Sequence, residues 1–104
     1  MSTQTSIFQA AQILLSQDSF TSSSITIKKP SGLFYLCRYP NNTISMYNAD
    51  DQRQVKIYLP SSISRCLIII DKPSRQVTFL LKALKIPDWA IRTLKFQSTV
   101  EIDL

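Results

Sequence analysis

The sequence predicts a mainly β fold, namely a small barrel or a strongly bent antiparallel sheet of six to seven strands with one N-terminal amphipathic helix. Short runs of aromatic and β-branched residues alternate with Pro, Asn, Asp and Ser clusters, as in small all-β domains. A chain of 104 residues with 44% hydrophobic content can build one core. We therefore expect a single globular domain over residues 6–104, after a polar and disordered segment at residues 1–5.

A helix is predicted over residues 6–17. Ser6 and Gln9 have the spacing of a capping box, in which each side chain accepts a hydrogen bond from a free backbone amide at the helix start. Ile7, Ala11 and Leu14 recur at i, i+4 and i+7 and form an apolar stripe. The helix should cover one face of the sheet.

Four strands are predicted next, at residues 24–29, 33–39, 43–47 and 53–59, and the last three of them form a β-meander. Gly32, the one glycine of the chain, favours a turn with positive φ after the first strand. Asn41-Asn42 suits a two-residue hairpin, and residues 49–52 form the next turn.

Centring the hairpins on these turns predicts the two faces of the meander. Ile44 and Met46 then share an inner face with Tyr39 and Cys37 on one side, and with Val55 and Ile57 on the other. The outer face carries aromatic, apolar and basic side chains: Leu36, Tyr47 and Gln54 in one row, Arg38, Ser45 and Lys56 in the next, and Phe34, Thr43 and Tyr58 beside them.

The second half of the chain is harder to interpret. Residues 65–70 are apolar on both faces, which predicts a central strand, and residues 76–81 are expected to return as another strand. Leu80, Leu81 and Leu84 have helical spacing, so helix is the open alternative there. Pro87-Asp88 favours a short helix at residues 88–93, and alternation predicts a strand at 94–104.

The composition argues against catalysis. The chain has no histidine, one glycine and two cysteines 29 positions apart, so common general bases, phosphate-binding loops and zinc sites are not expected. Asp50-Asp51 fits a plain turn better than a cation site. We predict that the protein is not an enzyme and has no cofactor or metal.

Cys37 and Cys66 are expected to be reduced core thiols rather than a disulfide.

Charge is unevenly distributed along the chain. All 12 Lys and Arg residues fall between residues 28 and 95, with four acidic residues, which gives this segment a net charge of +8. Such a segment suits an anionic partner, although solubility alone is the alternative.

No apolar run is long enough to span a membrane, and no signal peptide is evident, so we expect an intracellular protein, cytoplasmic or nuclear.

These patterns favour a small non-catalytic interaction module or complex subunit that docks on a protein partner, or on a second copy, through a sheet face or an edge strand. The alternative is a single-stranded nucleic-acid-binding protein that uses an aromatic and basic sheet face. The residues predicted to contact a partner or nucleic acid are Arg38, Tyr47, Arg53, Lys56, Tyr58, Lys28, Lys29, Phe34 and Leu36.

Two further expectations concern single side chains. Trp89 is expected to pack into the core, with an interface anchor as the alternative. Arg38 and Lys56 are predicted to be neighbouring like charges on the outer face. Replacing both with alanine should therefore leave the free energy of unfolding unchanged within about 0.5 kcal/mol, or raise it.

Overall fold

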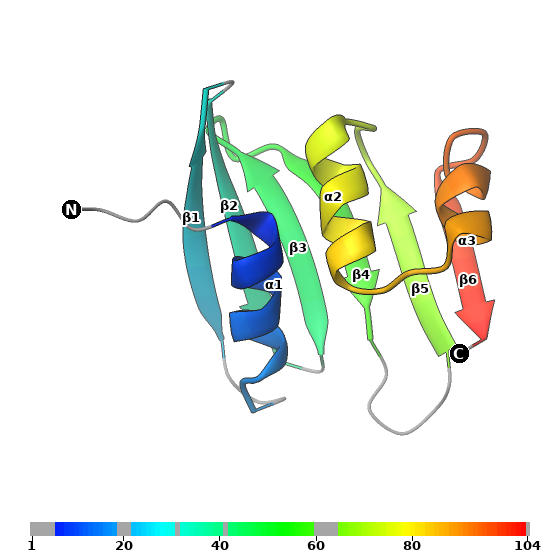
Figure 1. The fold of residues 1–104 in the computed structure, drawn as a ribbon, viewed down its shortest axis with the longest axis horizontal. Coiled ribbons are helices and arrows are strands. Elements are labelled where there is room, and N and C mark those ends of the chain that lie inside the picture. The colour runs from blue at the N-terminus through cyan, green and yellow to red at the C-terminus, as the bar shows by residue number, and fades with distance from the viewer. Residues whose placement is uncertain (1–5, 19–21, 31, 41, 60–64, 104) are drawn as a thin grey trace.

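Six antiparallel strands form one open sheet in the computed structural model, which describes residues 6–18, 22–30, 32–40, 42–59 and 65–103. The spatial order of the strands is their order in the chain, and β1 and β6 are the two edges (Figure 1). The strands are β1 (Ser23–Lys29), β2 (Gly32–Tyr39), β3 (Thr43–Asn48), β4 (Arg53–Tyr58), β5 (Arg65–Ile70) and β6 (Thr99–Asp103). The mainly β class is confirmed, but the sheet does not close into a barrel.

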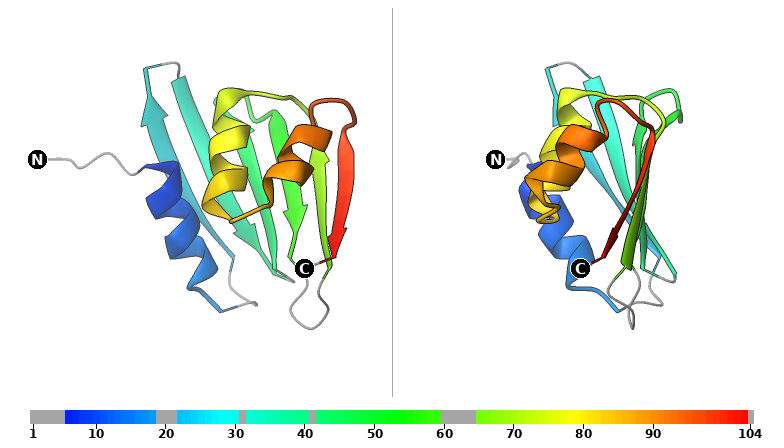
Figure 2. Two further views of the ribbon diagram at one scale, coloured as in Figure 1. Left: turned by 45° about the vertical axis from the view of Figure 1, so that its right-hand side comes forward. Right: turned by 90° about the vertical axis from the view of Figure 1, so that its right-hand side faces the viewer.

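Three helices cover one face of this sheet: α1 (Ile7–Leu15), α2 (Arg75–Ala83) and α3 (Asp88–Thr93). Figure 2 shows them side by side on the same side of the strands, and we call them the helical layer. The expected N-terminal helix is confirmed, and Ser6 forms the predicted capping box with Gln9. Ile7, Ala11 and Leu14 are buried against the sheet. Residues 1–5, predicted to be disordered, lie outside the described residues.

The second half of the chain corrects one strand and shortens another. Residues 76–81 belong to α2, so the strand predicted there is wrong. Ser74 caps the first turn by accepting a hydrogen bond from the Val77 amide, and Leu80 and Leu81 point into the core, as their helical spacing allowed. The helix at residues 88–93 is confirmed. Residues 94–98 form turns, so the last strand begins at Thr99 rather than at residue 94.

The register of the first meander hairpin differs from the prediction by one residue. Tyr39 pairs with Thr43, and residues 40–42 connect the strands. Pro40 holds φ near the value that suits the first loop position, and Asn42 adopts a φ of 57°, as expected at the last residue of a three-residue loop. The other predicted contacts, between Met46 and Val55 and between Ile44 and Ile57, are confirmed.

This one-residue change exchanges the two faces of β2. Phe34, Leu36 and Arg38 lie under the helices, whereas Tyr35, Cys37 and Tyr39 lie on the opposite face. The buried core therefore combines Ile27, Leu36, Ile44, Met46, Val55, Ile57, Cys66, Ile68 and Ile102 with apolar residues of the helical layer. Both cysteines are free thiols; Cys66 is in the core, as predicted, but Cys37 is half-buried on the opposite face.

Arg38 is the side chain for which this correction matters most. It is 4% exposed, and its guanidinium donates hydrogen bonds to the Leu14 carbonyl oxygen (2.6 Å) and to the Asn42 side-chain oxygen. Arg38 thus links the end of α1 to the β2–β3 connection. The prediction that Arg38 and Lys56 are neighbouring outer-face charges is wrong, and so is the basis for expecting no stability loss when both are removed.

Candidate functional site: the open face of the sheet

The face of the sheet opposite the helical layer has no element packed on it among the described residues, and we call it the open face (Figure 2). Strand pairing arranges its side chains in three rows that cross the sheet. The rows are Thr26, Tyr35, Tyr47 and Arg53; Ser24, Cys37, Ser45, Lys56, Ile69 and Thr99; and Tyr39, Thr43, Tyr58, Leu67 and Glu101.

All four tyrosines of the chain lie on the open face. Tyr35, Tyr47 and Tyr58 are half-buried, and Tyr39 is exposed. Their concentration on one face follows from β-strand alternation, which sends every second residue to the same side. With half-buried Leu67 and Ile69 on β5, they give the centre of this face a mixed aromatic and aliphatic surface.

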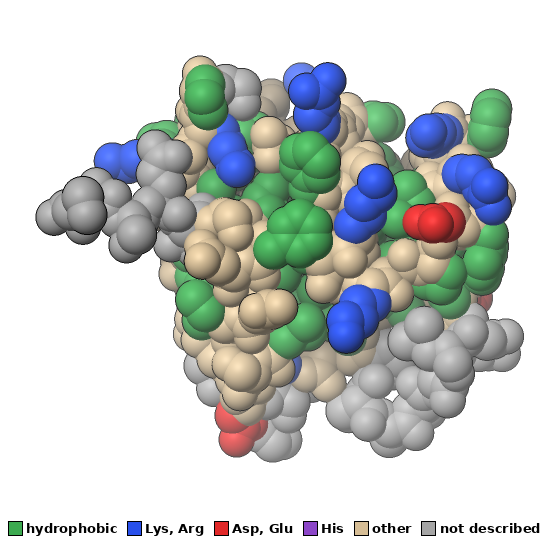
Figure 3. Space-filling view, viewed as in Figure 1, with side chains coloured by type: hydrophobic (Ala, Val, Ile, Leu, Met, Phe, Trp, Pro, Cys, Tyr) green, Lys and Arg blue, Asp and Glu red, His purple; other side chains and the backbone are tan. Residues whose placement is uncertain are grey.

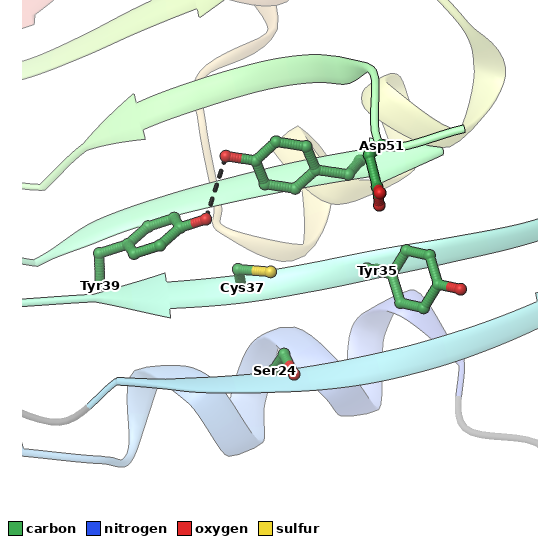
Figure 4. Close-up of a pocket in the computed structure, with 6 residues that line it drawn as sticks. Ser24, Tyr35, Cys37, Tyr39 and Asp51 are labelled. Carbon is green, nitrogen blue, oxygen red and sulfur yellow. Dashed lines mark hydrogen bonds between the residues drawn. The ribbon is translucent and has the colours of Figure 1, made fainter. Parts of the chain in front are cut away.

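A shallow hollow of about 380 Å³ lies between β1, β2 and β3 on this face (Figure 4). It is lined by Ser24, Tyr35, Cys37, Tyr39, Tyr47 and Asp51. Asp51 reaches the rim from the β3–β4 turn, where its φ is 57°. The lining offers hydroxyl, thiol, carboxylate and aromatic groups to a partner.

Hydrogen bonding fixes two of the tyrosines in place. The Tyr39 hydroxyl donates to the Tyr47 hydroxyl at 3.0 Å (Figure 4). This bond raises the pKa of Tyr39 above its ordinary value, with a smaller contribution from desolvation. Burial raises the pKa of the Cys37 thiol above its ordinary value.

One cation of the open face is paired with a carboxylate, and another lies against a tyrosine ring. Arg53 forms a bidentate ion pair with Asp71, with the shorter N–O distance at 2.7 Å, and this hydrogen bonding raises the pKa of the guanidinium. The Lys56 ammonium lies 4.8 Å from the centroid of the Tyr58 ring. Lys28 and Glu101 also lie on this face, and Asp51 lies at its rim.

The structure brings together part of the predicted site. Tyr47, Lys56 and Tyr58 share the open face with Lys28 and Arg53. Leu36, at 0% exposed, and Arg38 are buried beneath the helical layer. The remaining predicted residues, Phe34 and Lys29, are also directed to the helix-covered side.

Tyr39 and Cys37 lie on the open face although the sequence predicted them on the inner face, and Tyr35 was left out of the predicted site. Residues 33–37 are apolar or aromatic at every position, so alternation gave no signal for the face of β2. The loop chemistry at Pro40 and Asn42 held the missing information, because a connection over residues 40–42 sets the register that is observed.

Neither a metal-binding cluster nor a membrane-spanning helix is found among the described residues. Within the described ranges, no three His, Cys, Asp or Glu side chains gather where they could hold a metal ion. None of the helices that the structure describes has the length and apolarity needed to cross a membrane. Comparison with protein-family models, with curated proteins and with solved structures finds no match.

Proposed function

We propose that the protein is a non-catalytic interaction module that docks on a protein partner through the open face. The observation that carries this proposal is the gathering of all four tyrosines on a sheet face that no described element covers. Tyrosine is enriched at protein interfaces because its ring buries a large apolar area while its hydroxyl keeps a hydrogen-bond partner. The expected intracellular setting, cytoplasmic or nuclear, remains part of this proposal.

The burial of Arg38 and the pairing of Arg53 with Asp71 support a protein partner over nucleic acid. A groove that follows a phosphate backbone needs unpaired cations. Of the cations predicted for that role, Arg38 is buried and Arg53 is paired with Asp71. Lys56 and Tyr58 still fit the nucleic-acid alternative, since a cation and a ring can contact a phosphate and a base.

The edge strand β6 gives the module a second possible contact. It pairs with β5 on one side and lies at the edge of the sheet, as the edge-docking prediction requires. An extended segment of a partner, or β6 of a second copy, can add to such an edge by backbone hydrogen bonding. We rank this contact below the open face because the strand has five residues.

The proposal is tested with a pair of matched double variants. Tyr35→Ala with Tyr47→Ala alters the open face, and Phe8→Ala with Trp89→Ala removes two aromatic rings from the helical layer. Immobilised wild type and both variants are exposed to native extract, and the captured proteins are identified and re-bound in purified form. Sedimentation velocity across concentration measures self-association.

We expect the open-face variant to bind the purified partner, or a second copy, at least tenfold more weakly, about 1.4 kcal/mol. The helical-layer variant should bind it like wild type. Loss in the helical-layer variant alone would refute the assignment of the face. A wild type that stays monomeric, retains no protein and binds a mixed single-stranded oligonucleotide at low salt would replace this proposal with the nucleic-acid alternative.

A further inference from the structure

The side of the molecule opposite the open face has a different chemistry, and we propose that it binds the surface of an anionic lipid bilayer. The molecule is a slab with extents of 41 × 31 × 21 Å. α1, α2 and α3 lie side by side along one broad side of it (Figure 2). A planar partner can therefore contact all three helices at once.

The net charge of the protein is concentrated in the segment that contains α2 and α3. Residues 72–95 comprise α2, α3 and their flanking turns, and they hold six exposed cations and the single carboxylate of Asp88. The resulting charge of +5 equals that of the whole chain. The cations are Lys72, Arg75, Lys82, Lys85, Arg92 and Lys95, and Figure 3 shows blue side chains over both helices.

Aromatic rings lie among these cations on the outer sides of both helices. On α2, Arg75, Phe79 and Lys82 are spaced at i, i+4 and i+7, opposite the buried Val77 and Leu81. On α3, Trp89 is 50% exposed and Arg92 follows one turn later. Such pairing of cations with aromatic rings is typical of surfaces that lie in the headgroup region of a membrane.

The apolar exposure of α1 favours lipid over nucleic acid. This helix has no charged residue, and Phe8, Ile13 and Leu15 are each 43–48% exposed. Bases stack on aromatic rings, so an exposed isoleucine and leucine contribute little to binding of a single strand. At a bilayer surface Phe8 and Leu15, which are seven residues apart and share one side of α1, enter the boundary between headgroups and acyl chains. Figure 3 shows hydrophobic side chains gathered between α1 and α2.

Trp89 is the sole tryptophan of the chain and lies on the proposed surface, so it reports binding directly. The full chain is titrated with phosphatidylcholine vesicles, with and without phosphatidylserine, and co-sedimentation is measured in parallel. We expect a blue shift of Trp89 emission and co-sedimentation with phosphatidylserine vesicles only. Added salt should weaken binding because it screens exposed charges.

The charge contribution is tested with a matched pair of double variants. Lys82→Gln with Arg92→Gln removes two cations from the helical layer, and Lys28→Gln with Lys56→Gln removes two from the open face. Each juxtamembrane cation adds about fivefold to binding of an anionic bilayer, so the first variant should bind about 25-fold more weakly. The second should change binding by less than about fivefold, since its cations lie on the other side of the slab.

The apolar contribution is tested with Phe8→Ser and Leu15→Ser, both at exposed positions, after thermal unfolding has shown that each variant is folded. Weaker co-sedimentation of these variants supports the proposal. Equal binding by the two charge variants would overturn it. A Trp89 response to a mixed oligonucleotide with none to phosphatidylserine vesicles would assign the surface to nucleic acid instead, and no response to either would refute a membrane role while leaving the open-face proposal unaffected.

Discussion

Arg38 offers a direct test of the contacts between α1 and the sheet, because a buried and an exposed arginine respond differently to replacement by alanine. On an exposed face, its replacement by alanine would change the free energy of unfolding very little. In the structure it is 4% exposed and donates to the Leu14 carbonyl oxygen and the Asn42 side-chain oxygen. We expect Arg38→Ala to destabilise the fold strongly.

The magnitude follows from these contacts. Two hydrogen bonds from a charged donor contribute about 1.5–3 kcal/mol each. The Arg38 Nε is buried without a hydrogen-bond partner among the described residues. Removing this unsatisfied group regains about 1–3 kcal/mol, which reduces the loss. Taking the middle of each range, the net expected loss is about 2.5 kcal/mol. Lys56→Ala, the matched control on the open face, should cost no more than about 1 kcal/mol, the usual value of an exposed cation–π contact.

Urea unfolding followed by far-UV circular dichroism and by Trp89 fluorescence measures both variants. A double-mutant cycle of Arg38→Ala with Asn42→Gly then isolates one bond, and glycine is chosen because Asn42 has a φ of 57°. We expect a coupling of at least about 1 kcal/mol. The reasoning fails if Arg38→Ala is as mild as Lys56→Ala, or if the cycle shows no coupling.

Two further predictions concern the core and the first helix. Burial raises the pKa of the Cys66 thiol from 9.0 to about 11, so its stabilising effect is complete below pH 9 and is lost as the pH rises toward 11. A difference of two pH units corresponds to at most about 2.7 kcal/mol of unfolding free energy. In urea unfolding, wild type should therefore lose stability more steeply between pH 9 and pH 11 than Cys66→Ala does. Parallel declines of the two proteins would contradict this prediction. Ser6→Ala removes the capping box and should cost about 1 kcal/mol in the same assay, against no measurable change for the exposed Ser24→Ala control.

Much of the fold could be predicted because local chemistry agreed with the tertiary structure. The Ser6–Gln9 capping box, the strand at residues 65–70 and the helix at residues 88–93 each carry a complete signal within a few residues. Residues 76–81 misled because Val77, Phe79 and Leu81 also alternate like a strand. The competing signal was Ser74 at the N-cap together with the helical spacing of Leu80 and Leu84.

The candidate site was predicted in part for a related reason. Tyr47, Lys56 and Tyr58 lie on β3 and β4, whose polar–apolar alternation identifies the exposed side. β2 lacks that alternation, and its one clear polar residue, Arg38, points into the interior, where the end of α1 supplies an acceptor. Tertiary contacts of this kind cannot be derived from the pattern of a single strand.

The strand order has a consequence for how the chain folds. The pairs β1–β2, β2–β3, β3–β4 and β4–β5 each join strands that are close in the sequence. Most of the sheet can therefore assemble through local hairpins, which fold quickly. β6 is the exception, since 28 residues separate it from β5. The junction is closed by a hydrogen bond from the Ile70 amide to the Ser98 carbonyl oxygen (2.7 Å). We expect the first five strands to form as a nascent chain emerges, while the edge of β5 stays unpaired until residues 99–103 have been synthesised.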